Sequence, residues 1–308
     1  DMSQEVHTRL LWVFEGITSY YDDLALVRAG VVSLAEYSEL LAGNLTRILR
    51  TPGRLRQSLT DSSFDAWTKF YKQDENGPNA IISYYAKGAM VALALDLKLR
   101  SESEITLDDV MRECWQRFYL DDPRGMPESG LEDVVADLTG KDWTAFFDQT
   151  LRSTTDFDLT DLLATVGIHY EVRVPTSADD NGGQHQQPPY GVFAGFRLDP
   201  RQSSKVALVL NDSPASRAGL SAGDTVVAVN GRKTDKQGID ATLRAARPGD
   251  ALDIHVFRYD ALIQVTLTLA EPLADIVSLR IGDDETSEVI ERRQRWLHAS
   301  RWTDRHAP

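Results

Sequence analysis

Cysteine is nearly absent from this sequence: Cys114 is the only one among 308 residues. A lone cysteine cannot form an intramolecular disulfide, which excludes a cross-linked scaffold and leaves the cellular compartment open. Long apolar runs are missing too. The run AMVALAL at residues 89–95 is too short to span a bilayer, so we expect no membrane partner.

Positive charge is scarce. The sequence has 33 Lys and Arg residues against 47 Asp and Glu, which gives a net charge of −14. This excess of negative charge argues against a nucleic acid or an anionic membrane as the main partner. The remaining composition, 42% hydrophobic and 26% charged, is ordinary for a globular protein, and a chain of this length is expected to form two domains.

The first 165 residues are predicted to be mostly helical. Apolar residues recur at helical spacing, and Ser33 and Thr106 are placed to cap the helices that follow them. Cys114 has apolar neighbours on one of these helices and is expected to be a buried, unreactive thiol. The expected helices cover residues 5–29, 33–50, 62–71, 79–100, 106–119, 127–138 and 141–150.

The composition changes near residue 165. Residues 168–174 alternate like a strand, and segments between 190 and 270 are rich in Val, Ile, Leu and aromatic residues. The polar, Gly- and Pro-rich segment 175–189 is predicted to be a mobile loop. We therefore expect an α + β multidomain chain, with a helical domain over 1–165, a β-rich domain over 166–275 and a tail with a terminal helix over 276–308.

The segment NDSPASRAGLSAGDTVVAVNGRKT, residues 211–234, carries several local signals in a fixed order. Ser213 and Pro214 start a short helix, Gly223-Asp224 makes a tight turn into a strand, and Asn230-Gly231 is a turn pair that tolerates positive φ. Together these features resemble the centre of a bacterial PDZ domain.

PDZ domains bind extended peptides beside an exposed sheet edge, so the resemblance implies a C-terminal peptide as a ligand. The pattern x-Gly-hydrophobic of the carboxylate-binding loop falls on Tyr190, Gly191 and Val192. The second wall of the groove is expected at Ile239 and Leu243. As an alternative, the groove is filled by the linker or tail of this chain and serves only as a structural support.

The stretch LLWVFEGITSYYDDL, residues 10–24, reads as an amphipathic helix. Glu15 sits one position away from its apolar stripe. A carboxylate among large apolar side chains is costly to bury without a partner, so Glu15 needs an explanation. The predicted stripe consists of Leu10, Phe14, Ile17, Tyr21 and Leu24.

The residues around Glu15 resemble the W-x-x-E-G-x-x-x-Y stretch of the gluzincin zinc aminopeptidases, in which this Glu is the third zinc ligand. The stretch Tyr85-Ala86-Lys87-Gly88 is similar to the Tyr-x-Lys-Gly motif of the same enzymes. The resemblance implies that Tyr85 stabilises the oxyanion of the reaction. Tyr84 is the alternative if the alignment is shifted by one residue.

Among these enzymes the glycyl aminopeptidase family also carries a PDZ domain after its helical half. The resemblance implies the C-terminal part of a thermolysin-like peptidase domain, zinc in the parent protein, and removal of small N-terminal residues such as Gly or Ala from peptide substrates. The alternative is a helical-plus-PDZ scaffold that binds a peptide or partner and does no chemistry.

The two zinc histidines of the family motif H-E-x-x-H have no counterpart in this chain, because no two of its histidines are spaced at i and i+4. We expect that motif upstream of Asp1 and this chain to be a fragment that is inactive, binds no zinc by itself and self-associates through its uncovered face. The resemblance suggests a bacterial protein and leaves the cytoplasm and the periplasm open. The six histidines are His7, His169, His185, His255, His298 and His306.

Overall fold

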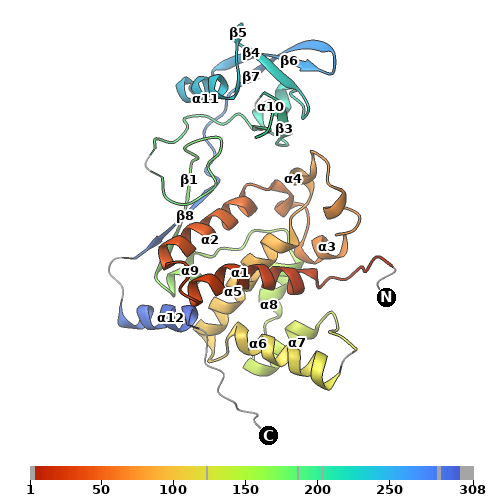
Figure 1. The fold of residues 1–308 in the computed structure, drawn as a ribbon, viewed down its shortest axis with the longest axis vertical. Coiled ribbons are helices and arrows are strands. Elements are labelled where there is room, and N and C mark those ends of the chain that lie inside the picture. Colours follow the sequence, from red (N-terminus) through yellow and green to blue (C-terminus); the bar gives the residue numbers. More distant parts are fainter. Residues whose placement is uncertain (1–3, 123, 186, 203, 283–285, 299–308) are drawn as a thin grey trace.

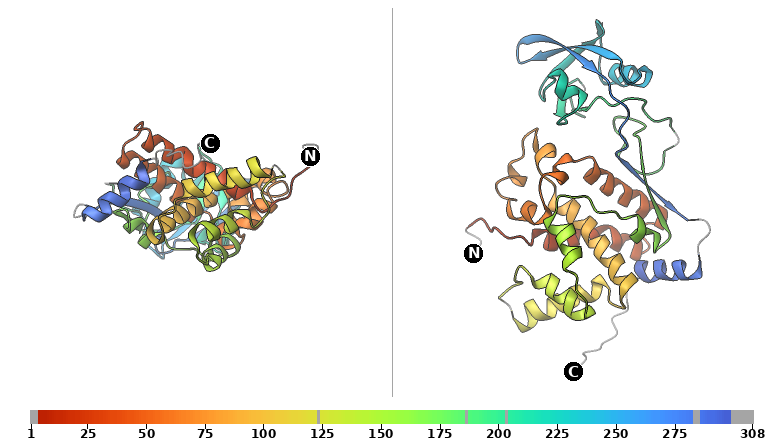
Figure 2. Two further views of the ribbon diagram at one scale, coloured as in Figure 1. Left: turned by 90° about the horizontal axis from the view of Figure 1, so that it is seen from below. Right: turned by 180° about the vertical axis from the view of Figure 1, so that it is seen from behind.

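The protein has two separate cores. The computed structural model describes residues 4–122, 124–185, 187–202, 204–282 and 286–298. One core belongs to a large helical domain and the other to a smaller β-rich domain. Figures 1 and 2 show the two domains at opposite ends of the molecule, connected by the strands β1 and β8. The α + β multidomain prediction is confirmed.

The helical domain is built around α5 (Tyr84–Glu102), which carries the run noted as apolar in the sequence. Every side chain from Val91 to Leu97 is buried, because α1, α2, α3 and α6 surround this helix. No described helix is both long and apolar enough to cross a membrane. The other helical segments are η1 (Trp12–Gly16), α1 (Ile17–Arg28), α2 (Leu34–Leu49), η2 (Pro52–Leu55), α3 (Leu59–Phe64), η3 (Phe70–Lys72), α4 (Gly77–Ala80), α6 (Leu107–Trp115), η4 (Gln116–Asp121), α7 (Gly130–Thr139), α8 (Thr144–Phe147), η5 (Asp148–Arg152), α9 (Thr160–Ala164) and α12 (Ser287–Leu297).

The predicted helix starts at Ser33 and Thr106 are confirmed. Each residue accepts a hydrogen bond from the backbone of the third helical residue, and Glu36 and Asp109 complete the two capping boxes. Cys114 is buried, as expected, and burial raises the pKa of its thiol to about 11. The thiol is therefore protonated and unreactive at neutral pH.

The apolar stripe predicted for residues 10–24 is wrong at Phe14, whose side chain is 51% exposed. The reason is the π-helical turn η1, which is wider than an α-helical turn and shifts the phase of the helix. Trp12, Val13 and Tyr20 face the core in its place.

The strand β1 (Ile168–Arg173) pairs antiparallel with β8 (Ile276–Ile281). We call this pair the β-stalk. The sequence placed β1 in the second domain and β8 in a separate tail, but Ile168 and Leu279 belong to the core of the helical domain. The backbone N–H of Val277 also donates to Oγ1 of Thr46 on α2, at 2.9 Å. The expected boundaries at 165 and 275 therefore divide residues that pack together.

The terminal helix α12 closes the helical domain. Trp296 is fully buried, and its Nε1 donates a hydrogen bond of 2.8 Å to the hydroxyl of Tyr20. That hydroxyl donates in turn to the buried carboxylate of Asp96, also at 2.8 Å. This chain of hydrogen bonds satisfies polar groups that would be costly to bury alone, and it fixes α12 against α1 and α5.

The β-rich domain contains a four-stranded sheet in the order β5-β4-β6-β7 and a two-stranded sheet of β2 and β3. Asn230, with a φ of 50°, makes the turn into β5 that the sequence predicted. The elements are β2 (Phe196–Leu198), β3 (Val206–Val209), α10 (Pro214–Ala218), β4 (Thr225–Val229), β5 (Arg232–Lys233), α11 (Lys236–Ala245), β6 (Ala251–Arg258) and β7 (Ala261–Thr268).

Candidate functional site

Glu15 lies on the π-helical turn η1 and is half-buried. Among the described residues its carboxylate has no hydrogen bond and no ion pair, although the neighbouring segments are dense with both. A half-buried carboxylate normally finds a partner, because leaving it unpaired costs free energy. π-Helical turns also occur frequently at functional sites. Glu15 is therefore the clearest candidate for a ligand-binding group in the helical domain.

Two glycines bring η1 and α5 into direct backbone contact. A Cβ atom built on Gly16 would lie 2.6 Å from the Cα of Gly88, and one built on Gly88 would lie 2.8 Å from the Cα of Gly16. Only glycine permits such a close approach. These are the glycines that follow Glu15 and Lys87 in the two sequence motifs, so the motifs meet at this crossing.

The crossing places Tyr85 beside Glu15. The Tyr85 side chain is half-buried. Burial raises the pKa of its phenol above the ordinary value, and the negative charge of Glu15 adds to this rise. The phenol is therefore protonated at neutral pH, in the form that can donate a hydrogen bond.

Tyr84, the alternative to Tyr85, occupies a different environment. Its side chain is only 1% exposed, and its hydroxyl lies 2.9 Å from the hydroxyl of Tyr71. The rings of Tyr84 and Tyr85 contact each other, with centroids 4.6 Å apart. Tyr71 is part of this group but was not predicted, since nothing in its own neighbourhood in the sequence relates it to either motif.

The described residues do not assemble a metal site by themselves: in that part of the chain no three His, Cys, Asp or Glu side chains gather. His7 is bound elsewhere, with Nδ1 3.0 Å from the carbonyl oxygen of Phe64. Glu15 fits a zinc ligand in its chemistry, because its carboxylate is half-buried and has no partner in the part of the chain that the structure describes. The residues present thus fit one ligand position and not a complete site.

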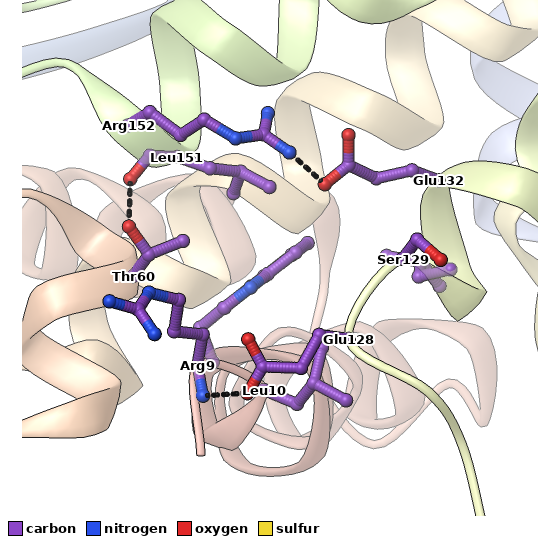
Figure 3. A pocket seen from close by; sticks show the side chains of 10 residues that line it. Arg9, Leu10, Thr60, Glu128, Ser129, Glu132, Leu151 and Arg152 are labelled. Atoms are coloured by element: carbon purple, nitrogen blue, oxygen red, sulfur yellow. Dashed lines mark hydrogen bonds and ion pairs between the residues drawn. The ribbon is translucent and has the colours of Figure 1, made fainter.

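A hollow of about 340 Å³ lies near the start of η1, the turn that carries Glu15, and is shown in Figure 3. Most of its polar side chains already have partners, several of them within the hollow. Arg152 contacts Glu132, Thr60 donates to the carbonyl oxygen of Leu151, and the backbone N–H of Arg9 donates to Glu128 at 3.0 Å. A site whose polar groups are satisfied internally offers little to a polar ligand, so we do not place function there.

The second candidate site is a cavity of about 400 Å³ in the β-rich domain, between β2 and α11. Four of the predicted groove residues line it: Tyr190, Val192, Ile239 and Leu243. Gly191 is exposed beside the C-terminal end of α11, where a Cβ atom would lie 3.7 Å from the carbonyl oxygen of Ala246. The residues predicted for the groove therefore lie around or beside one cavity, and their role in peptide binding stays a prediction.

Several residues from outside the β-rich domain also line the cavity. Arg50 comes from the end of α2, and Asp275 directly precedes β8. Arg50 Nε donates to Asp275 Oδ2 at 3.1 Å. Burial and the nearby charge of Arg50 lower the pKa of Arg197, on β2, to about 10. No local pattern could have indicated these residues, because they meet only through the placement of the two domains.

Comparison with known proteins agrees with this geometry. Residues 1–91 match the family described as M61 glycyl aminopeptidase, and residues 192–269 match the PDZ domain family. None of the curated proteins compared with the chain matches it. In the crystal structure of an aminopeptidase N family protein from Idiomarina loihiensis, 35% of the aligned residues are identical and the TM-score is 0.87. The alignment covers 97% of this chain and 50% of that protein, so the chain spans about half the length of this relative.

Two further similar structures share only a short region. A serine endoprotease from Yersinia pestis is 26% identical over 27% of this chain and 29% of its own, with a TM-score of 0.23. The HtrA-type protease AlgW with a decapeptide is 23% identical over 27% of this chain and 30% of its own, with a TM-score of 0.24. Scores this low carry no argument about function.

Fold and comparisons together define a helical domain that matches a peptidase family, joined to a β-rich domain of the PDZ class. More particularly, residues 1–91 belong to an M61 glycyl aminopeptidase domain, and residues 192–269 form a PDZ domain. The predicted resemblance to the glycyl aminopeptidase family and the PDZ domain at residues 211–234 are therefore confirmed, whereas the roles of Glu15 and Tyr85 stay predictions.

Proposed function

We propose that this chain contributes the zinc ligand Glu15 and the oxyanion donor Tyr85 to an aminopeptidase that removes small N-terminal residues such as Gly or Ala. One observation carries the proposal: a half-buried carboxylate that has no hydrogen-bond or ion-pair partner among the described residues lies beside a protonated phenol at the Gly16–Gly88 crossing. The match of residues 1–91 to the M61 glycyl aminopeptidase family supports it. The substrate preference rests on the family alone.

The roles of the two side chains follow from their chemistry. Zinc, when bound, would activate water and polarise the scissile carbonyl. The Glu15 carboxylate would be one of its ligands, and the described residues do not supply a complete ligand set around it. The Tyr85 phenol would donate a hydrogen bond to the oxygen that becomes negatively charged. The close backbone contact between Gly16 and Gly88 fixes the position of the Glu15 carboxylate relative to the Tyr85 phenol.

Glu15→Ala tests the metal-binding role. In the complete protein we expect the substitution to reduce bound zinc well below one ion per molecule, because one of the protein ligands is lost. Zinc is measured by mass spectrometry of the purified protein, and activity on a glycyl substrate is measured in parallel. Asp22→Ala, an exposed position on the same helix, is the control and should keep its metal. Full zinc content and unchanged activity in Glu15→Ala would contradict the proposal.

We further propose that the PDZ domain binds peptides that end in a free carboxylate. Among the described residues β2 pairs only with β3, and its other edge borders the cavity lined by Ile239 and Leu243. An unpaired strand edge beside an apolar cavity is the arrangement that accepts an additional peptide strand. This role holds whether or not the helical domain performs chemistry, so it is also the core of the alternative in which the protein only binds partners.

Peptide binding can be measured directly on this chain. A pool of peptides with free C-terminal carboxylates is expected to shift the backbone amide NMR signals of Gly191 and Val192, because those amides would meet the carboxylate. The same pool with amidated C-termini serves as the control and should leave the signals in place. Identical spectra with both pools would favour a groove that acts only as a structural support.

A further inference from the structure

The segment that leads from the β-stalk into the PDZ domain lies along the peptide groove. We call residues 175–180 the strap. It contacts α11 near both ends of that helix: the ammonium of Lys236 lies 2.6 Å from the carboxylate of Asp179, and Arg244 Nη2 donates to the carbonyl oxygen of Thr176 at 2.6 Å. The strap also lines the cavity between β2 and α11. It therefore covers the groove along the helix that forms its second wall.

The strap has a defined conformation built around Asp180. This side chain is buried and accepts hydrogen bonds from Arg173 at 2.7 Å and from the backbone N–H groups of Thr176 and Gly182 at 2.9 and 3.2 Å. These donors hold the pKa of Asp180 far below its ordinary value, despite the opposing effect of burial. This part of the loop expected to be mobile is thus organised by its own hydrogen bonds.

The strap occupies a group that a peptide ligand would need. The backbone N–H of Tyr190 belongs to the proposed carboxylate-binding loop, and it donates to the carbonyl oxygen of Pro175 at 2.8 Å. A carbonyl oxygen of the strap thus lies where an oxygen of a ligand carboxylate would accept a hydrogen bond. One N–H cannot donate to both acceptors at once, so the strap and the ligand carboxylate compete for the Tyr190 N–H.

The strap is also bound to the helical domain. Nη1 of Arg50 donates to the carbonyl oxygen of Asp180 at 2.7 Å, while its Nε is paired with Asp275. Because the strap follows directly from β1, its position is determined by the helical domain as well as by α11. A displacement of the strap would therefore change contacts on both sides of the domain junction.

We propose that the strap is an autoinhibitory element: it closes the PDZ groove, and a peptide with a free C-terminal carboxylate must displace it to bind. The proposal rests on the proposed peptide binding of the PDZ domain. It predicts that loosening the strap makes peptide binding tighter. It also predicts that the amide of Tyr190 becomes more accessible when the strap is loosened, even without a ligand.

Two substitutions loosen the strap while they change the local charge in opposite directions. Asp179→Asn removes a negative charge and Lys236→Met removes a positive one, and each breaks the same ion pair. An exposed pair of this kind contributes roughly a two- to fivefold factor in an equilibrium. Lys233→Met, on the exposed strand β5, is the matched control because it removes the same kind of charge away from the strap.

The first measurement needs no ligand. Amide hydrogen exchange of Tyr190, followed by NMR on the full chain, should become roughly two- to fivefold faster in Asp179→Asn and in Lys236→Met, and should stay unchanged in Lys233→Met. Unchanged exchange in both strap variants would overturn the proposal, because the strap would then not protect the loop.

The second measurement uses a fluorescein-labelled heptapeptide with a free carboxylate, selected from a peptide library as a binder of the unmodified chain. Both strap variants should bind it about two- to fivefold more tightly than the unmodified chain. If only the charge near the ligand mattered, Lys236→Met would bind this anionic terminus more weakly. Equal or weaker binding in both variants would overturn the autoinhibitory role of the strap and leave the proposed peptide binding in place. No binder for any variant would overturn the strap and the proposed peptide binding together.

Discussion

Tyr85→Phe is expected to reduce kcat of the complete protein by roughly 10²–10³ while leaving its zinc content unchanged. The substitution removes one hydroxyl from a ring that is otherwise kept in place by Tyr84 and Phe70. Because the hydroxyl would donate to charge that develops during the reaction, KM should change much less than kcat. Steady-state kinetics on a glycyl substrate, with metal analysis of the same samples, measures both quantities.

Tyr84→Phe is the matched control for this prediction. Its hydroxyl is buried and interacts with the hydroxyls of Tyr71 and Tyr85, so its loss should lower the free energy of unfolding by about 1 kcal/mol and reduce kcat much less than the loss of the Tyr85 hydroxyl. Urea denaturation measures the stability change. If Tyr84→Phe shows the large loss of activity and Tyr85→Phe does not, then the phenol that takes part in the reaction is Tyr84 and our assignment is wrong.

Gly88→Ala is expected to destabilise the helical domain by about 1–3 kcal/mol or more. The new Cβ atom would lie 2.8 Å from the Cα of Gly16 and 3.2 Å from the carbonyl oxygen of Trp12. Backbone atoms in two packed helices cannot move aside as a flexible side chain can, so η1 and α5 must separate. Because Glu15 and Tyr85 lie on either side of this contact, activity should fall even under conditions where the variant is still folded.

Gly43→Ala separates this steric effect from the general effect of replacing a helical glycine. Gly43 lies within α2, and a Cβ atom there would meet only the carbonyl oxygen of Asn181, at 3.4 Å. Since alanine favours the helical conformation, this variant should be neutral or up to about 1 kcal/mol more stable. Urea titrations of both variants decide the matter: equal stability of Gly88→Ala and Gly43→Ala would show that the crossing tolerates a side chain.

Features that depend on a few neighbouring residues were predictable from the sequence. The capping boxes at Ser33 and Thr106 and the turn at Asn230 follow from chemistry within four residues, and all three were found as expected. The short helix α9 was missed, since the five residues Thr160–Ala164 are too few to show a helical period.

Features that depend on distant contacts were not predictable. The π-helical turn at Trp12–Gly16 changes which residues are buried, and Phe14 was misplaced for that reason. The strand β1 alternates like any other strand, and only its pairing with β8 assigns it to the helical domain. The same holds for the candidate sites. Motifs indicated Glu15 and Tyr85, whereas Tyr71 and Arg50 reach their sites only through the tertiary fold.

The β-stalk has a consequence for the order in which the protein is made. About a hundred residues separate Arg173 from its partner Ile276, and they include the whole PDZ domain. At typical translation rates the ribosome needs roughly 5–20 s to synthesise them. During that time the helical core is incomplete, because Val277, Leu279 and Trp296, which are buried in it, have not yet been synthesised. The PDZ domain, whose core is contiguous in the sequence, can therefore fold first, and the larger domain is completed only after β8 and α12 have been synthesised.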